Sequence, residues 1–129
     1  MKGLMETNCY DIEEDIIIVG TCLKNIQPGA YEELLKISKN LYEICLEEIH
    51  VNMVITKIGA MLSRCNVKKL VFATIDRSPH CIQVHYIENE LRKMMNLYGV
   101  EIIHYVAVDN KLVEISKEKI KKSKCLSEN

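Results

Sequence analysis

The sequence predicts an α/β protein, a small three-layer sandwich whose mostly parallel sheet has three strands plus a short C-terminal antiparallel strand. Three runs rich in branched aliphatic residues support this fold class: 15–21, 68–75 and 100–108 are apolar almost throughout, with little alternation between apolar and polar residues. Such continuous runs are typical of strands that are buried on both faces of a sheet. Helical periodicity between the runs predicts that right-handed crossovers join consecutive strands.

The first strand is followed by a long segment with helical spacing. Residues 15–21, DIIIVGT, form the strand, and the apolar positions after the next loop predict a helix over 30–48. A single helix continuing to Arg64 would far exceed the usual length, so we expect a break near 48–52 and a second helix that stops near Asn66. The apolar positions that define the two helices are Leu34, Leu35, Leu41, Tyr42 and Cys45, then Val54, Ile55, Ile58, Met61 and Leu62.

The second half of the chain repeats this strand and helix pattern. Lys68–Ile75 is the second predicted strand. Ser78 can accept a hydrogen bond as N-cap of the next helix, and Pro79 suits its first position because the missing N–H costs nothing there. We expect this helix to run to Leu97 and Gly99 to close it. Its apolar side is Ile87, Leu91, Met94 and Met95.

The remaining elements complete one predicted domain that spans the whole chain, 1–129. Val100–Val108 is the third strand, and the turn residues of 109–111 lead into a short fourth strand, Leu112–Ile115. We expect the N-terminal segment 1–14 to be irregular and the lysine-rich tail 117–129 to be frayed.

Composition and charge exclude several functional classes. The net charge of −1 argues against broad binding to nucleic acid, because such proteins carry a basic surplus. No apolar stretch is long enough for a membrane span, and the N-terminus lacks the pattern of a secretory signal, so we expect a cytoplasmic protein. The GxGxxG, Walker, GxSxG, HExxH and EF-hand patterns are also absent from the sequence.

Six cysteines are many for a cytoplasmic domain of this size. Without an export signal we do not expect a disulfide framework, and no CxxC pair occurs, which removes the strongest sequence signatures of zinc ribbons, ferredoxin clusters and thioredoxin-like sites. The thiols are therefore expected to be free. Those that lie beside other reactive side chains become the candidates for function.

The carboxyl ends of the predicted strands carry such side chains. Ligands of parallel α/β sheets bind at these ends. The first strand ends at Thr21-Cys22, the second leads into DRSPHC over 76–81, and the third ends at Asp109-Asn110. We therefore expect the functional site at this rim of the sheet.

A metal site is the leading hypothesis for this rim. The positive end of the helix dipole would lower the pKa of Cys81, which we expect in the first helical turn, and His85 would lie on the same helical face. His80 would stay neutral and able to ligate. If Cys22 approaches across the sheet, then Cys22, His80, Cys81 and His85 could bind a transition metal ion or an iron–sulfur cluster. This hypothesis implies an accessory or redox-linked protein with a redox partner.

A second use of the rim needs no metal. Asp76, Arg77 and Ser78, together with free N–H groups at the helix start, could bind a small anionic ligand or a partner protein without catalysis. A third hypothesis is an enzyme that uses Cys81 as a nucleophile, and the sequence leaves open whether the protein is an enzyme. A homodimer is also compatible with so small a sheet.

Other polar, sulfur-containing and titratable residues are interpreted as structural. Glu88 and Glu90 are expected on a solvated helix face, and the Met94-Met95 pair in the core. The remaining residues interpreted as structural or incidental are Cys9, Cys45, Cys65, Cys125, His50 and His104.

Two stretches carry a family resemblance. The run TIDRSPHCIQVHY and the preceding VITKIGAML, together within residues 54–86, resemble small α/β proteins of anaerobic bacteria and archaea that are often described as iron–sulfur or ferredoxin-associated. This resemblance implies a metal cluster, although the cysteine ladder of a ferredoxin is absent. A looser similarity is to kink-turn RNA-binding ribosomal proteins, whose Gly-Thr-Asn-Glu helix start is missing here.

Overall fold

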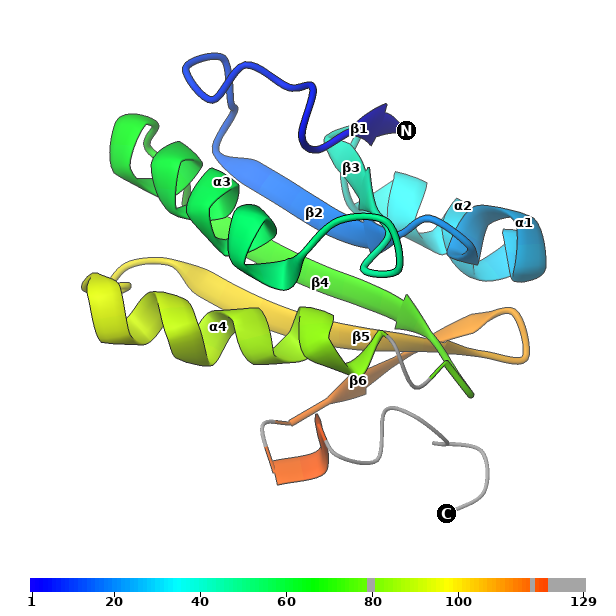
Figure 1. Ribbon diagram of the computed structural model, residues 1–129. Coiled ribbons are helices and arrows are strands. Elements are labelled where there is room, and N and C mark those ends of the chain that lie inside the picture. The colour runs from blue at the N-terminus through cyan, green and yellow to red at the C-terminus, as the bar shows by residue number, and fades with distance from the viewer. Residues whose placement is uncertain (79–80, 117, 121–129) are drawn as a thin grey trace.

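A six-stranded sheet with helices on both faces forms the molecule, seen in a computed structural model (Figure 1). The structure describes residues 1–78, 81–116 and 118–120. Its elements in chain order are β1 (Lys2–Gly3), β2 (Asp15–Gly20), α1 (Leu23–Ile26), α2 (Pro28–Ile37), β3 (Leu41–Ile44), α3 (Val51–Arg64), β4 (Lys69–Ile75), α4 (Ile82–Met94), β5 (Glu101–Val108) and β6 (Lys111–Ile115).

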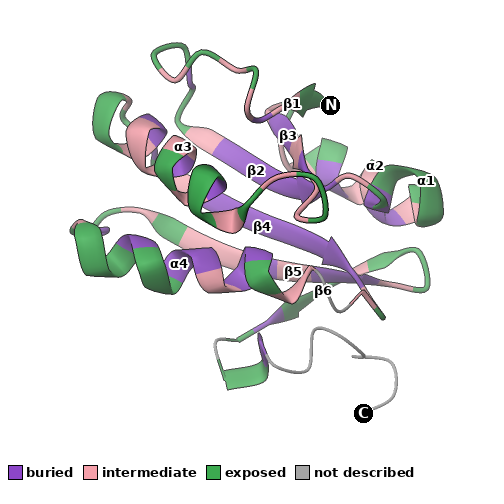
Figure 2. Ribbon diagram, viewed as in Figure 1, coloured by how far each residue is buried: buried purple, intermediate pink, exposed green. Residues whose placement is uncertain are grey.

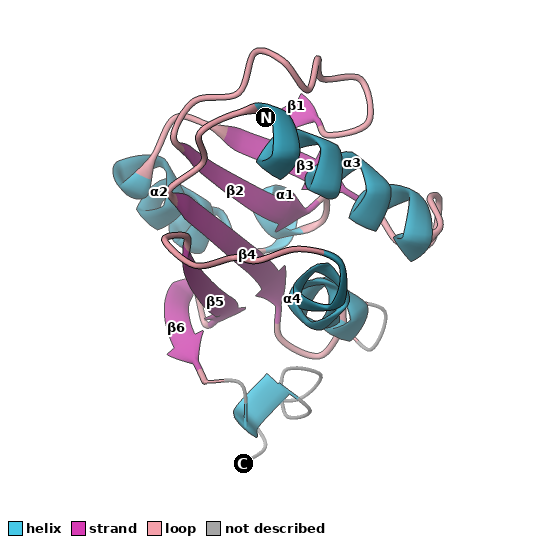
Figure 3. Cartoon of the chain, turned by 90° about the vertical axis from the view of Figure 1, so that its left-hand side faces the viewer, coloured by secondary structure: helices cyan, strands magenta, loops and turns pink. Residues whose placement is uncertain are grey.

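The sheet has the strand order β1-β3-β2-β4-β5-β6, and every pair is parallel except β5 with β6. From the central strand β2 the chain moves outward to β3, then returns across the sheet to β4 on the other side. Helices α1 and α2 cover one face, and α3 and α4 cover the other (Figure 3). The predicted α/β class and mostly parallel sheet are confirmed, but β1 and β3 are two parallel strands beyond the three that were predicted.

The central strands are buried on both faces, as their continuous apolar sequences predict (Figure 2). Along β2, Ile16 and Ile18 pack in the core beneath α3 and α4, whereas Ile17 and Val19 pack in the core beneath α1 and α2. Alternation of side chains along a strand explains this division. Each such side chain contributes roughly 1.5–3 kcal/mol when fully buried, so the two cores together fix the sheet between its helical layers.

The predicted helix over 30–48 is wrong beyond Ile37, where α2 ends. Ser38 is extended at φ −161°, and its N–H bonds to the Leu34 carbonyl as the last helical bond. The Asn40 side chain then donates to the Asp15 carbonyl at 3.1 Å, which ties the chain to the start of β2. Residues 41–44 follow as β3, because pairing with β2 buries the apolar side chains that a helical reading placed on one helix face. The expected second helix is confirmed as α3.

The helix after β4 begins later than its sequence predicts. Cys81 is its N-cap, and Ser78 does not cap it, since Ser78 Oγ donates instead to Cys81 Sγ at 3.1 Å. Pro79 lies outside the described residues. The helix ends at Met94, and Gly99, at φ 87°, lies beyond it in the connection to β5.

The expected hairpin at the C-terminal side is confirmed. Asp109 and Asn110 have φ of 50° and 63°, the left-handed pair that a tight hairpin turn requires, and β6 pairs antiparallel with β5. As the last strand in the order, β6 is an edge. Its Leu112 N–H donates to Glu33 Oε2 at 3.0 Å, so a side chain of α2 covers part of this edge.

The two chain ends differ in part from their predictions. The segment 1–14 contains β1 within otherwise irregular structure, and residues 118–120 of the tail form a short turn. Ile120 is buried with Val106 and Ile115, so this part of the tail is packed and not frayed. Residues 117 and 121–129 lie outside the described chain. Within the part that is described, no helix has the length and apolar character to cross a membrane.

Two helical glycines give a matched pair for a stability test. A Cβ on Gly29 of α2 would lie 2.8 Å from the Asn110 carbonyl oxygen, whereas a Cβ on Gly59 of α3 would lie 3.7 Å from Leu91. We expect Gly59→Ala to stabilise the fold by about 0.5–1 kcal/mol through helix propensity. We expect Gly29→Ala to destabilise it by about 1–3 kcal/mol, because the hairpin must move. Urea unfolding of both variants measures the two changes in the free energy of unfolding. A change of the same sign in both would contradict the close approach of Gly29 to Asn110.

Candidate functional site

A pocket lies at the carboxyl ends of the three adjacent parallel strands β2, β3 and β4. It offers about 100 Å³ to water-sized molecules. This is the point where the chain direction switches between the two sides of the sheet, the usual place for ligands in such folds. The lining residues are Gly20, Thr21, Cys22, Ile44, Cys45, Leu46, Glu47, Ser78, Cys81 and Val84.

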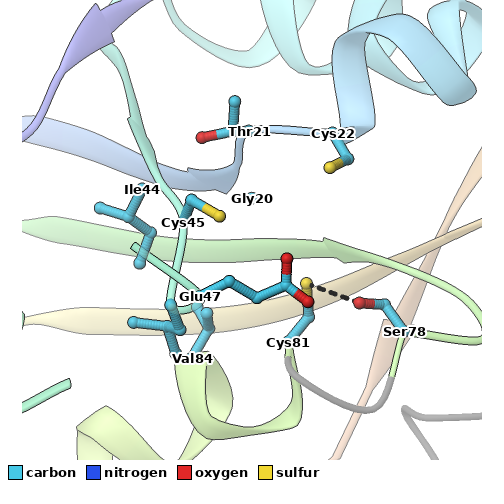
Figure 4. A pocket seen from close by; sticks show the side chains of 10 residues that line it. Gly20, Thr21, Cys22, Ile44, Cys45, Glu47, Ser78, Cys81 and Val84 are labelled. Carbon is cyan, nitrogen blue, oxygen red and sulfur yellow. Dashed lines mark hydrogen bonds between the residues drawn. The ribbon is translucent and has the colours of Figure 1, made fainter. Parts of the chain in front are cut away.

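Three cysteines from three chain segments meet in this pocket (Figure 4). Cys22 follows β2, Cys45 follows β3, and Cys81 begins α4 after β4. Their sulfur atoms point toward one another from different sides of the hollow. The Thr21 N–H donates to the Ile44 carbonyl at 2.9 Å, which extends the β2–β3 pairing to the pocket and holds the first two cysteines on neighbouring segments.

The surroundings of the Cys81 thiol determine its ionisation. Burial raises its pKa, whereas the hydrogen bond from Ser78 and the Ile75 backbone lower it. Negative charge on Cys22 and Cys45 would raise this pKa further. The expectation of an acidified thiol is therefore wrong, since loss of hydration outweighs the hydrogen bonds from Ser78 and Ile75 that lower the pKa.

The seven predicted site residues do not all lie at the pocket. Cys22, Ser78 and Cys81 line the pocket. Asp76 and Arg77 lie in the turn after β4 outside the pocket lining; the Asp76 N–H bonds to the Ala107 carbonyl and Arg77 has φ 64°. His80, a predicted ligand, lies outside the described residues.

His85 is not at the pocket but in the core between α4 and the sheet. It is fully buried, and its Nε2 lies 2.8 Å from Thr74 Oγ1 on β4. Its Nδ1 lies 2.9 Å from His104 Nδ1 on β5. Burial and the neighbouring His104 lower the pKa of His85 from 6.5 to about 3, so the ring is neutral. In the residues that the structure describes, no three His, Cys, Asp or Glu side chains are arranged to hold a metal ion.

The buried imidazoles belong to a longer hydrogen-bonded chain, which we call the polar relay: Thr74, His85, His104, Glu88 and Arg92. His104 Nε2 lies 2.7 Å from Glu88 Oε1, and Arg92 Nε donates to Glu88 Oε2 at 2.7 Å. Glu88 is only 2% exposed, so its predicted place on a solvated helix face is wrong. Met94, predicted in the core, is 62% exposed.

The lining residues that sequence reasoning missed include one thiol and one carboxylate, Cys45 and Glu47. Both follow β3. Because a helix was predicted in place of this strand, their position at the rim of the sheet could not be predicted. Sequence reasoning also missed the relay partners Glu88 and His104. The i,i+4 spacing of Glu88 and Arg92 was the available signal, but such pairs are common on solvated faces.

Comparisons with known proteins bear on the fold alone. No curated protein and no solved structure matches this chain. Among protein families, the Rossmann-like domain matches residues 12–129, which include β2 to β6 and α1 to α4. The chain therefore belongs to the Rossmann-like domain family.

Proposed function

We propose that this domain binds a thiophilic metal ion or a small metal cluster in the pocket, with Cys22, Cys45 and Cys81 as its thiolate ligands. One observation carries this proposal: three of the five described free cysteines line a single pocket at the switch point of the sheet. Thiolates select zinc, copper(I) and iron–sulfur centres over hard cations. Cys45 takes the place that the sequence hypothesis assigned to His85, whose ring nitrogens are engaged in the core.

The size of the pocket supports a metal centre over an organic ligand. Sites for small organic molecules usually enclose roughly 300–1,000 Å³. This pocket offers about 100 Å³ and is lined mainly by apolar atoms and thiols. Neighbouring thiolates repel one another, and a bound cation would offset that repulsion. Since the described thiols do not already form a metal-holding group, binding would draw them inward, with His80 as a further predicted ligand.

A metal centre on so small a domain fits an accessory or redox-linked role beside a partner protein. The alternative of a small anionic ligand has less support. Glu47 is the one charged side chain among the ten described lining residues, and it would repel an anion. A nucleophilic Cys81 also has less support, because burial raises the pKa of its thiol.

Metal analysis after anaerobic purification and loading with zinc, or with iron and sulfide, tests the proposal. We expect one bound centre per chain, and a loss of affinity of at least about tenfold in each of Cys22→Ser, Cys45→Ser and Cys81→Ser. Cys9→Ser is the control, because Cys9 packs against the core beside α3, away from the pocket lining.

The variants also separate the two ligand sets. Loss of metal in His85→Gln with full retention in Cys45→Ser would favour the set expected from sequence. Substoichiometric metal in the unmodified protein under both loading conditions would overturn metal binding at this pocket.

A further inference from the structure

We infer that His85 is a positioning residue, which fixes the start of α4 on the sheet and thereby holds the Cys81 thiol at the pocket. The benefit of holding Cys81 rests on the proposed function, but the hydrogen bonds that hold it involve no metal. Cys81 and His85 are four residues apart and share one helical face. Through His85, the first turn of α4 is bonded to Thr74 on β4 and to His104 on β5.

All the hydrogen bonds of the polar relay can form at the same time. The Glu88 carboxylate accepts from Arg92 Nε and from His104 Nε2. One proton fits between the two facing Nδ1 atoms, so one ring donates there and the other accepts. The other nitrogen of the neutral His85 ring, Nε2, shares a hydrogen bond with Thr74 Oγ1, whose hydroxyl can donate or accept. Every buried nitrogen of both rings is satisfied, and removal of the Thr74 hydroxyl leaves one of them unpaired.

The relay specifies the register of α4 more sharply than apolar packing does. Val84, Ile87 and Leu91 also face the sheet from this helix. Apolar side chains tolerate small shifts with modest loss, whereas hydrogen bonds of 2.7–2.9 Å between buried groups do not. His104 is itself fixed by stacking on Phe72, with ring centroids 5.2 Å apart. The anchor of α4 is therefore rigid on the sheet side.

The start of α4 depends on such an anchor, because its own cap is weak. In the described part of the chain, the N-cap residue Cys81 makes no side-chain capping bond. The turn before it contains Arg77 in the left-handed region. Among the described residues, His85 adds two hydrogen bonds between the first helical turn and the sheet to the single contact of the Cys81 thiol with the Ile75 backbone.

The test is the rate at which iodoacetamide alkylates Cys81 in the metal-free protein, followed by mass spectrometry with Cys9 as internal reference. Thr74→Val removes the hydroxyl at nearly constant shape, and we expect Cys81 to react at least about fivefold faster. Thr74→Ser keeps a hydroxyl and is expected to restore the rate to within about twofold of the unmodified protein. Ile87→Val is the matched control: it weakens packing of the same helix without touching the relay.

Two results would overturn the inference. An unchanged Cys81 rate in Thr74→Val would show that the relay does not hold the helix start. An equal acceleration in Ile87→Val would show general loosening of α4. Alkylation needs no metal, so this test also decides the inference in a protein that binds none. Absence of metal binding would overturn the proposed function alone. In a protein that binds metal, Thr74→Val is also expected to lower the affinity for the metal.

Discussion

Glu88→Ala is expected to lower the free energy of unfolding by about 3 kcal/mol. The Glu88 side chain is 3% exposed and accepts hydrogen bonds from His104 and Arg92, both at 2.7 Å. Truncation leaves the His104 Nε2–H buried without its acceptor, and removal of one partner of a buried charged pair typically costs about 3–5 kcal/mol. Because the Arg92 side chain is 43% exposed and can regain water, we place the cost at the lower end.

The same helix provides the control. Glu90 pairs with Lys93 at 2.9 Å, but these side chains are 49% and 69% exposed. Exposed pairs contribute about 0–1 kcal/mol, so Glu90→Ala is expected to change the unfolding free energy by a few tenths of a kcal/mol. Urea titrations of both variants compare two similar carboxylates that differ mainly in burial. Similar losses would contradict the buried position of Glu88.

Acidification is expected to destabilise the protein through His85. Burial and His104 lower the pKa of His85 in the folded state to about 3, whereas the unfolded chain titrates near 6.5. Above pH 6.5 both states are neutral and this residue adds no pH dependence. As the pH falls below 6.5, only the unfolded state binds the proton, so stability falls until the folded pKa is reached. At about 1.36 kcal/mol per unit, the loss from pH 7 to pH 5 is about 2 kcal/mol.

A comparison of pH dependences isolates this contribution from other groups. The unfolding free energy of the unmodified protein and of His85→Gln is measured at pH 7 and pH 5. We expect the variant to start less stable but to lose about 2 kcal/mol less over this interval. NMR of the His85 ring is expected to show a neutral imidazole at pH 5. Parallel stability curves, or a ring that titrates near pH 6.5, would disprove the low pKa.

The sequence predicted those parts of the fold that depend on burial on both faces. The runs IIIV and LVFA form β2 and β4, which are buried along almost their whole length, and IIHYVAV forms β5, whose burial is only partial. The short strand β3 was missed, because Leu41, Tyr42 and Cys45 also fit helical spacing. Their environment depends on the pairing of β3 with β2. Residues distant in sequence make this pairing, so the local sequence pattern gives little sign of it.

The site followed the same pattern. Cys22 and Cys81 could be placed at the rim, because each follows a strand that was predicted correctly. Cys45 could not, because its strand was not predicted. The spacing of Cys81 and His85 correctly indicates one helical face, but spacing does not say whether that face meets a pocket or the core. The imidazole of His85 lies in the core because His104 on β5 provides a buried hydrogen-bond partner there.

The bond from Leu112 N–H to Glu33 has a consequence for behaviour at high concentration. An unpaired amide on an outermost strand is where a foreign strand can dock, extend the sheet and start fibrillar assembly. Here that amide is already occupied by a carboxylate of the same molecule. A newcomer strand must displace Glu33 before it can pair with β6 at Leu112.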